Sequence, residues 1–402
     1  MQNGRSGIND FGLLPYPTIN NGVILGIDSN MAEFTVTPWE VTGDIDYDEL
    51  QRKFGTTPID DKLLARLGGY REIHPMLRRG IFYSHRDMNW LLDKYDKGQK
   101  FTIYTGRGPS GNTHLGHMMP WIFNKWVQDT FDVPMLFQMT DDEKFLFKDL
   151  TLHDTRNMAY ENALDFIALG FDPEKTKIIL DTECVKTLYP LALKVAKKIT
   201  FSTAKAVFGF ENSSNIGQIF YTSMQAAPAF LPTEMEGKEV PVVIPCGIDQ
   251  DPHFRVARDA APGLGYPKPC MIYCKMFPGL NGGDKMSSSD ENATIYTTDT
   301  PKAVKKKVGK AFTGGCVSVE EQRQNGGNPD VCAVFKYNYY MFEHDDEKLE
   351  EMARKCRNGE ILCGECKMAL TEKINVFLED HQAKREEAKE VVDSMTFDGF
   401  KW

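Results

Sequence analysis

The sequence predicts an α/β fold, in which a doubly wound parallel sheet forms the central domain and a helical domain follows it. Three observations lead to this prediction. In the middle of the chain, short apolar runs typical of strands alternate with helical patterns, which favours a parallel sheet covered by helices. Beyond about residue 298 the strand-like runs stop and helical patterns alone remain. Before about residue 95, short alternating pieces mix with a helical stretch.

The expected strands are short and apolar, and helical patterns separate them. They are 101–105, 134–139, 176–180, 241–245 and 270–275. In the helix after the fourth strand, Asp251 is the expected N-cap and Pro252 the first helical residue. A chain of 402 residues has room for two or three domains. We expect an N-terminal appendage over 1–95, the sheet domain over 96–297 and an all-helical domain over 298–402.

The loop after the first strand reads GRGPSGNTHLGH. Sheets of this kind bind ligands at the carboxyl ends of their strands, so chemistry is expected here. The loop is neither a Walker A loop nor a GxGxxG fingerprint. It places His114, Gly116 and His117 at the entrance to a helix, where unpaired N–H groups and the helix dipole favour an anion. Taken alone, HxxH indicates two ordinary histidines more readily than a metal pair. Pro120 is expected to kink this helix or delay its start.

The other strand ends are also polar. The second strand ends FQMTDDEKF, the fourth ends CGIDQDPHFR, and the helical stretch SMQAAPAF adds the amide of Gln225. The fifth strand leads into NGGDKMSSSDEN, where Lys285 predicts a mobile clamp on a polyphosphate. The alternative is a capping box of Ser288 and Glu291 that opens a short helix. Neither phosphate-type loop is decisive alone, but their occurrence after the first and last strands predicts a nucleotide site.

Composition limits the class of protein. The net charge of −10 argues against indiscriminate nucleic-acid binding. It leaves room for a local basic patch such as Lys302–Lys310, although a solvated helix face explains that run on charge alone. No apolar run approaches the roughly 18 residues that span a bilayer. The N-terminus lacks a secretory or transit pattern, so a cytoplasmic location without membrane contact is expected.

The sequence predicts no protein-bound metal. Nine cysteines in a chain of this length indicate reduced thiols. Cys356, Cys363 and Cys366 cluster in sequence, but zinc would require a fourth ligand, and none follows at ordinary spacing. The helical pattern around them favours cysteines packed as small apolar side chains. The acidic run Asp141–Glu143 is explained more simply as a solvated loop.

At the two phosphate-type loops the chain resembles the class I aminoacyl-tRNA synthetases, whose signatures are HIGH and KMSKS. Within that class, it is most similar to the cytosolic eukaryotic tryptophanyl-tRNA synthetases. The segments that carry this likeness read YTGRGPS, HLGH, QMTDDEK, QAAPAF, DQDPHFR, GYPKP and KMS-S. The resemblance covers roughly residues 35 to 395, and it implies a Rossmann-like sheet domain of the HUP type.

The resemblance implies a two-step reaction. The carboxylate of L-tryptophan attacks the α-phosphate of ATP to give tryptophanyl-adenylate and pyrophosphate, with Mg²⁺ sharing the charge. The terminal adenosine of tRNA(Trp) then takes the acyl group. The helical domain would read the anticodon, and the protein would act as a homodimer. The open alternatives are tyrosyl-tRNA synthetase, another HxGH adenylate-forming enzyme, and a protein that kept the fold as a non-catalytic binding module.

The resemblance also implies roles for individual residues. Those expected to bind ATP are Gly106, Arg107, Gly108, His114, Gly116, His117, Gln250, Lys285, Met286 and Ser287. Those expected to bind tryptophan are Tyr104, Gln138, Thr140, Glu143, Gln225 and Gln250, the first two at the indole N–H. Those expected to act in catalysis are Arg107, His114, His117, Lys285 and Ser287.

The chain departs from the general KMSKS pattern at one position. Ser288 stands where the general motif has a second lysine, so this loop brings one cation instead of two. We expect the missing charge to come from Mg²⁺, Arg107 or Lys144.

Overall fold

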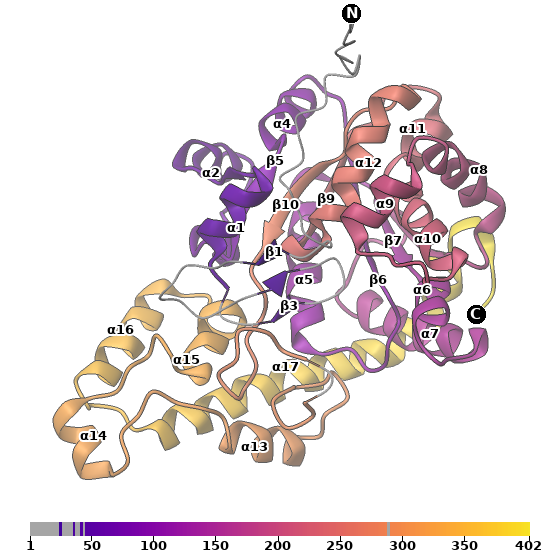
Figure 1. Ribbon diagram of the computed structural model, residues 1–402. Helices are drawn as coiled ribbons and strands as arrows, with labels where there is room; N and C mark the ends of the chain where they lie inside the picture. Colours follow the sequence, from indigo (N-terminus) through magenta and orange to yellow (C-terminus); the bar gives the residue numbers. More distant parts are fainter. Residues whose placement is uncertain (1–23, 26–34, 37–40, 43–44, 288–289) are drawn as a thin grey trace, which may run out of the picture.

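A seven-stranded mixed sheet forms the centre of the molecule (Figure 1). The structure is a computed structural model that describes residues 24–25, 35–36, 41–42, 45–287 and 290–402. The sheet order is β4-β5-β10-β9-β6-β7-β8. Its strands are β4 (Thr57–Pro58), β5 (Phe82–Arg86), β6 (Thr102–Arg107), β7 (Met135–Met139), β8 (Thr176–Leu180), β9 (Val242–Gly247) and β10 (Cys270–Cys274). A separate small sheet holds β1 (Ile24–Leu25), β2 (Thr35–Val36) and β3 (Val41–Thr42).

The five strands that the sequence predicted are all present, with ends that shift by up to two residues. In the part of the sheet ordered β10-β9-β6-β7-β8, every pair of neighbouring strands is parallel, which confirms the doubly wound core. The N-terminal segment contributes more than packing, because β5 pairs antiparallel with β10 and β4 pairs antiparallel with β5. Arg86, at the end of β5, donates to the buried carboxylate of Asp251 at 2.8 Å and so joins this segment to the sheet domain.

Helices cover both faces of the sheet. Those of the N-terminal segment and the sheet domain are α1 (Tyr47–Phe54), α2 (Asp61–Gly68), α3 (Pro75–Arg78), α4 (Met88–Asp96), α5 (Leu115–Phe131), α6 (Asp141–Phe147), α7 (Leu152–Ile167), α8 (Val185–Ala196), α9 (Phe201–Phe208), α10 (Ile216–Ala226), α11 (Leu231–Glu236) and α12 (Asp251–Leu264). Short 3₁₀ turns lie at Ala227–Ala229, Ile248–Gln250, Val392–Met395 and Phe397–Gly399.

Two local predictions about helix starts change. Helix α5 begins at Leu115 and contains Pro120, so the proline does not delay its start. Helix α12 has Gln250, not Asp251, at its N-cap, because a 3₁₀ turn runs directly into it. Asp251 is instead fully buried and pairs with Arg86 and Arg255. The two cationic partners offset the cost of burying this carboxylate.

The C-terminal part is all-helical, as predicted. Its helices are α13 (Pro301–Gly309), α14 (Val319–Asn325), α15 (Ala333–Tyr337), α16 (Asp346–Arg357) and α17 (Cys363–Val391), with a π-helical turn at Asn338–Phe342. Figure 1 shows α17 running from this part back to the sheet domain. There Nε2 of His381 in α17 lies 3.0 Å from Oδ1 of Asp165 in α7, and both side chains are almost fully buried.

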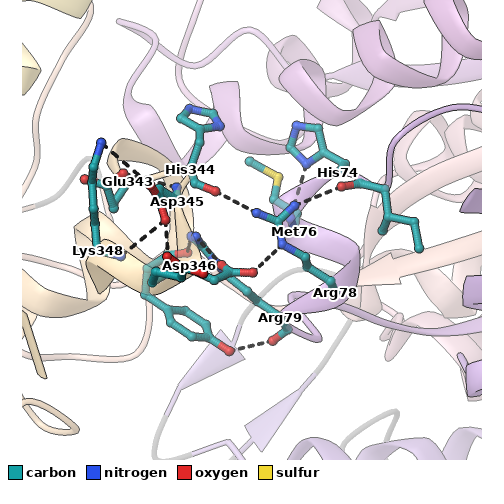
Figure 2. Close-up of polar contacts among 12 residues, drawn as sticks. His74, Met76, Arg78, Arg79, Glu343, His344, Asp345, Asp346 and Lys348 are labelled. Atoms are coloured by element: carbon teal, nitrogen blue, oxygen red, sulfur yellow. Dashed lines mark hydrogen bonds and ion pairs between the residues drawn. The ribbon is translucent and has the colours of Figure 1, made fainter. Parts of the chain in front are cut away.

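A second junction joins the N-terminal segment to the C-terminal helices (Figure 2). Arg78 and Arg79 at the end of α3 both pair with Asp346, the first residue of α16. Arg79 also donates to the Tyr339 carbonyl at 2.7 Å, and the Tyr339 hydroxyl donates back to the Arg79 carbonyl at 2.6 Å. The Arg79 side chain is 5% exposed and that of Arg78 is 30% exposed, so the junction is buried at Arg79. Among the described residues, no helix is long and apolar enough to cross a membrane.

Candidate active site

A cleft of about 600 Å³ opens at the carboxyl ends of the parallel strands. It is lined by every residue that the sequence assigned to ATP, tryptophan or catalysis: Tyr104, Gly106, Arg107, Gly108, His114, Gly116, His117, Gln138, Thr140, Glu143, Gln225, Gln250, Lys285, Met286 and Ser287. The strand-end argument therefore identified one physical site. The individual roles stay predictions.

Two neutral histidines stand at the N-terminus of α5. The His114 backbone N–H donates to Nδ1 of His117 at 3.2 Å, and the rings stack with centroids 3.5 Å apart. Because Nδ1 of His117 accepts this bond, the ring proton lies on Nε2 and can be donated to a ligand. Burial, with a smaller effect of Arg107, lowers the pKa of His114 to about 3 and that of His117 well below its ordinary value. Both rings therefore act as hydrogen-bond donors and not as cations at neutral pH.

Arg107 is the buried cation of the cleft. It ends strand β6 and is 8% exposed. Its Nη2 donates to the Gly111 and Asn112 carbonyls at 3.4 Å each, whereas Nε and Nη1 have no hydrogen-bond partner among the described residues. Burial lowers the pKa of Arg107 to about 10. A buried guanidinium with unpaired donors is suited to a bidentate contact with a phosphate.

The KMS segment lies beside the histidine loop. The Leu115 N–H donates to the Ile295 carbonyl at 3.1 Å, and the Thr297 N–H donates to the Thr113 carbonyl at 3.0 Å. These bonds fix the chain after the KMS segment against the start of α5. Lys285 is near enough to the two histidines to contribute to their lowered pKa values.

Met286 anchors this segment while Lys285 stays exposed. Met286 is 3% exposed, and its N–H donates to the Phe277 carbonyl at 2.6 Å. The Thr294 hydroxyl donates to the Ser287 carbonyl at 2.6 Å. The alternative capping box depends on Ser288, which lies outside the described residues.

The floor of the cleft holds a directed chain of hydrogen bonds. The Tyr104 hydroxyl is the donor to two acceptors that share its proton, Oε1 of Gln138 and the Gln225 carbonyl at 2.6 Å. Nε2 of Gln138 donates to both carboxylate oxygens of Asp181, at 2.8 and 2.9 Å. Gly106 allows strands β6 and β7 to lie close together beside this chain of bonds, because a Cβ at Gly106 would lie 2.8 Å from the Gln138 carbonyl oxygen. The chain leaves a lone pair of the Tyr104 oxygen as an acceptor for a donor in the cleft.

Other polar side chains surround the middle of the cleft. The Thr140 hydroxyl donates to Oε2 of Glu143 at 2.9 Å, and Nζ of Lys144 lies 2.7 Å from Oε1 of the same carboxylate. Nε2 of Gln225 donates to Oε1 of Gln250 at 3.2 Å. Carboxylate and amide oxygens at this position can accept hydrogen bonds from an ammonium group.

Comparison with known proteins identifies the family. Residues 96–379 match the model of the class I tRNA synthetases for tryptophan and tyrosine (W and Y). The chain belongs to this family.

Individual relatives are close over most of their length. A tryptophan–tRNA ligase of Pyrobaculum calidifontis is 52% identical over 364 residues, which cover 90% of this chain and 97% of the relative. Two solved tryptophanyl-tRNA synthetases have the same fold. The Plasmodium falciparum structure has a TM-score of 0.84 at 38% identity and covers 88% of this chain and 98% of its own. The Encephalitozoon cuniculi structure, bound to tryptophan, has a TM-score of 0.78 at 35% identity and covers 88% and 99%.

The sequence reasoning missed one functional candidate in this synthetase site, Asp181. It follows β8 directly and is 1% exposed. Its carboxyl is in hydrogen-bonding contact with that of Asp142. Burial, followed by repulsion from Asp142, raises the pKa of Asp181, and burial, followed by repulsion from Asp141, raises the pKa of Asp142 to about 7. Both carboxylate oxygens of Asp181 are placed to accept from Nε2 of Gln138. The strand-end rule applied to β8 would have found this residue.

Proposed function

We propose that this chain is a tryptophan–tRNA ligase that activates L-tryptophan with ATP and transfers it to tRNA(Trp). The observation that carries the proposal is the directed Asp181–Gln138–Tyr104 chain at the floor of the cleft that also holds both nucleotide loops. An indole presents a single N–H donor, and Tyr104 offers the matching acceptor. The family match and the identity to a curated tryptophan–tRNA ligase support the same conclusion.

The first step needs positioning and charge stabilisation. A carboxylate oxygen of tryptophan bonds to the α-phosphorus while the bond from that phosphorus to the bridging oxygen breaks, and the electron pair leaves with pyrophosphate. Arg107 donates to the α-phosphate, the two histidines donate N–H bonds to phosphate oxygens, and Lys285 balances charge on the separating pyrophosphate. The terminal adenosine hydroxyl of the tRNA then attacks the acyl carbon, and AMP leaves.

Selectivity follows from hydrogen-bond matching at the cleft floor. Phenylalanine would leave the Tyr104 acceptor unpaired, and an unpaired buried polar group costs roughly 1–3 kcal/mol. Tyrosine carries its polar group at a different position on the ring. Smaller side chains bury less apolar surface in the same space.

Mg²⁺ would enter with the phosphates of ATP. Among the described residues, no three histidine, cysteine, aspartate or glutamate side chains are arranged to hold a metal ion. The Glu143 carboxylate in the cleft is already engaged by Lys144. This arrangement suits Mg²⁺, which keeps several waters and is commonly held by substrate phosphates. When bound, it would neutralise charge on the leaving pyrophosphate.

A homodimer is part of the proposal. Helix α8 exposes Val185, Tyr189 and Leu193, spaced four residues apart on one face, with each side chain about 45% exposed. Such a stripe suits a second copy of the chain. Sedimentation should give a dimer, and Tyr189→Glu with Leu193→Glu should give monomers. A cytoplasmic location is proposed because tRNA charging serves translation there.

The test of the activity is amino-acid-dependent exchange of pyrophosphate into ATP. We expect exchange with tryptophan and not with tyrosine, followed by charging of tRNA(Trp). Lys285→Ala should lower kcat by roughly 100-fold while the KM for tryptophan changes only a few-fold, because its charge acts on the transition state. Exchange with neither amino acid would overturn the proposal, and exchange with tyrosine alone would favour the tyrosine enzyme of the same family.

A further inference from the structure

A second lysine lines the cleft beside the KMS segment, and the sequence assigned it no role. Lys275 directly follows β10, at the carboxyl end of a strand that runs parallel to β9. The strand-end rule that located the other site residues therefore applies to it as well. Its side chain is half-buried, and its backbone N–H donates to the Ile81 carbonyl at 2.9 Å.

A short loop connects Lys275 to Lys285, and a backbone hydrogen bond joins its two ends. The Met286 N–H donates to the Phe277 carbonyl at 2.6 Å. Lys275 lies two residues before one end of this bond, and Lys285 lies one residue before the other end. Both lysines line the cleft. The closed loop therefore places two lysines at the same part of the cleft wall.

A tyrosine of the N-terminal segment holds the Lys275 side chain. The ammonium nitrogen lies 5.6 Å from the centroid of the Tyr47 ring. The Tyr47 hydroxyl accepts from the Met276 N–H at 2.8 Å, so the tyrosine also fixes the backbone beside the lysine. Tyr83 packs edge-on against Tyr47, with ring centroids 5.2 Å apart. A ring face holds a cation more weakly than a phosphate does, so an anion in the cleft can draw the ammonium away from the ring.

In the part of the chain that the structure describes, the Lys275 ammonium forms no ion pair with a carboxylate. Burial lowers its pKa, and the Asp48 carboxylate opposes this shift only in part. Lys144, one of the side chains expected to supply the missing charge, already pairs with Glu143 at 2.7 Å. A half-buried ammonium without a counter-ion is stabilised when an anionic ligand arrives.

We propose that Lys275 is the second cation of the triphosphate site and provides the charge that the general KMSKS motif supplies with its second lysine. This inference rests on the proposed function, because the anion is the triphosphate of ATP. Lys285 contacts the phosphates from the KMS segment, and Lys275 contacts them from the end of β10. Lys275 acts by charge and hydrogen bonding alone, and no covalent bond to it forms.

The direct test compares the binding of ATP with the binding of adenosine by titration calorimetry of the full chain. Lys275→Met keeps an apolar stem and removes the charge. We expect it to weaken ATP binding about 10-fold or more, the worth of one charge-assisted hydrogen bond, and to leave adenosine binding within about two-fold. Lys275→Arg should keep most of the ATP affinity. An unchanged ATP affinity in Lys275→Met, or an equal loss for both ligands, would overturn the inference.

Pyrophosphate exchange gives a second readout. In Lys275→Met, kcat/KM for ATP should fall about 10-fold or more, whereas the KM for tryptophan should change less than about two-fold. Lys268→Met is the matched control, because Lys268 is an exposed lysine that precedes the opposite end of β10 and lies outside the cleft. It should behave like the wild type. A rise in the KM for tryptophan as large as the effect on ATP would contradict a phosphate contact.

A missing activity and a missing role of Lys275 would show in different measurements. If the wild type exchanges pyrophosphate with no amino acid, the proposed function fails, and the comparison of ATP with adenosine still decides whether Lys275 holds the triphosphate. If the wild type exchanges with tryptophan and Lys275→Met binds ATP as tightly, only the role of Lys275 fails. Circular dichroism checks that the variant is folded, and Lys275→Gln gives the same comparison if the methionine variant misfolds.

Discussion

At the residue scale, the orientation of the Gln138 amide sets the polarity of the cleft floor. Because Nε2 of Gln138 is held by Asp181, its Oε1 faces the Tyr104 hydroxyl and can accept a hydrogen bond from it. If the amide turned over, its NH₂ would face Tyr104, and the hydroxyl would direct its proton elsewhere. The Tyr104 oxygen would then be a poorer acceptor for an indole N–H. Asp181 is therefore a positioning residue for substrate selectivity.

Removing the Asp181 carboxyl should weaken the binding of tryptophan more than the binding of an analogue that lacks the indole N–H. We predict that Asp181→Leu raises the KM for tryptophan about 10-fold or more, because one matched buried hydrogen bond is worth roughly 1–3 kcal/mol. The KM for 3-(3-benzothienyl)alanine, in which sulfur replaces the indole nitrogen, should rise far less. Pyrophosphate exchange with each amino acid measures the ratio. A general loss of structure would raise both values together.

Two matched variants separate orientation from charge. Asp181→Asn keeps an oxygen that can accept from Gln138 and should preserve most of the preference for tryptophan. Asp141→Asn removes a neighbouring buried carboxylate that is bonded to Thr182 and not to Gln138. It should leave the ratio unchanged. A similar loss of preference in Asp141→Asn would mean that the total negative charge matters, and not the orientation of the amide.

The residues of the cleft were largely predictable, because chemistry in a parallel sheet gathers where the strands end. Asp181 obeys the same rule but was missed, since an acidic residue after a strand has no distinctive pattern. The N-cap role predicted for Asp251 was wrong for a tertiary reason. Its partners Arg86 and Tyr273 come from β5 and β10, and no local pattern announces them.

At the scale of elements, the junction between α3 and α16 contains two histidines, His74 and His344, whose pKa values burial lowers. His74 is the N-cap of α3, where its Nδ1 accepts from the Met76 N–H at 3.2 Å (Figure 2). Burial, followed by repulsion from His344 and the two arginines Arg78 and Arg79, lowers the pKa of His74 to about 4. Glu343 and Asp346 face the same region but pair with Lys373 and with the arginines.

This shift makes the junction sensitive to acid. Below a pH of about 6.5 the unfolded chain binds a proton on this histidine, whereas the folded chain stays neutral until about pH 4. Stability should therefore fall as the pH drops from 6.5 to 4 and should not fall further from this group below pH 4. His74→Asn keeps a capping oxygen and removes the titration. We predict that it unfolds like the wild type at pH 7 and is more stable at pH 5, by on the order of 2 kcal/mol.

Denaturant unfolding at the two pH values measures this difference. Other buried histidines, such as His253, titrate in both proteins and cancel in the comparison. An equal loss of stability with acid in wild type and variant would show that His74 does not contribute.

Helix α13 is the second element with a testable role. Lys302, Lys305 and Lys306 are exposed, whereas Lys307 pairs with both carboxylate oxygens of Asp299. If this face lies on the tRNA backbone, each lysine replaces counterions at about one phosphate. We predict that changing the three exposed lysines to glutamine weakens tRNA binding and reduces the slope of log K against log salt by about three.

The control for α13 is Lys197→Gln with Lys198→Gln, two exposed lysines just after α8. Binding of tRNA should keep its salt slope in this variant. An unchanged slope in the α13 variant would restore the simpler interpretation of that run as a solvated helix face.

At the scale of the whole molecule, three sequence parts share one core. The alternation of strands and helices predicted the sheet domain and the helical C-terminal part. It did not show that the 1–95 segment adds two antiparallel strands to the sheet, because both strands are short and β5, which carries β4, pairs with β10 nearly 190 residues later in the chain. Strand pairing over such a distance depends on tertiary packing, which one sequence does not reveal.

Among the described residues, one of the clusters of buried apolar side chains crosses all three parts. It runs from Leu63 of α2 through the sheet domain to Leu370, Ile374 and Leu378 of α17. Polar links cross the same boundary: the His381–Asp165 pair is buried, and the Gln382 amide donates to the Thr297 carbonyl at 2.7 Å. A helical domain that shares its core with a sheet cannot bury its apolar face alone.

We therefore predict that the chain unfolds as one cooperative unit and that residues 298–402 alone do not fold. Calorimetry of the full chain should show a single transition, with fluorescence and far-ultraviolet circular dichroism giving the same midpoint. The isolated segment should show exposed apolar surface and no cooperative transition, since α17 loses its contacts with α7. Leu378→Ala, on the face of α17 that enters the shared core, should lower the midpoint of both signals together by several degrees, because a buried Leu→Ala change costs roughly 2–5 kcal/mol. The opposite result would be two separated transitions, of which Leu378→Ala shifts only one. It would show that the parts are stable independently and that the shared cluster contributes little.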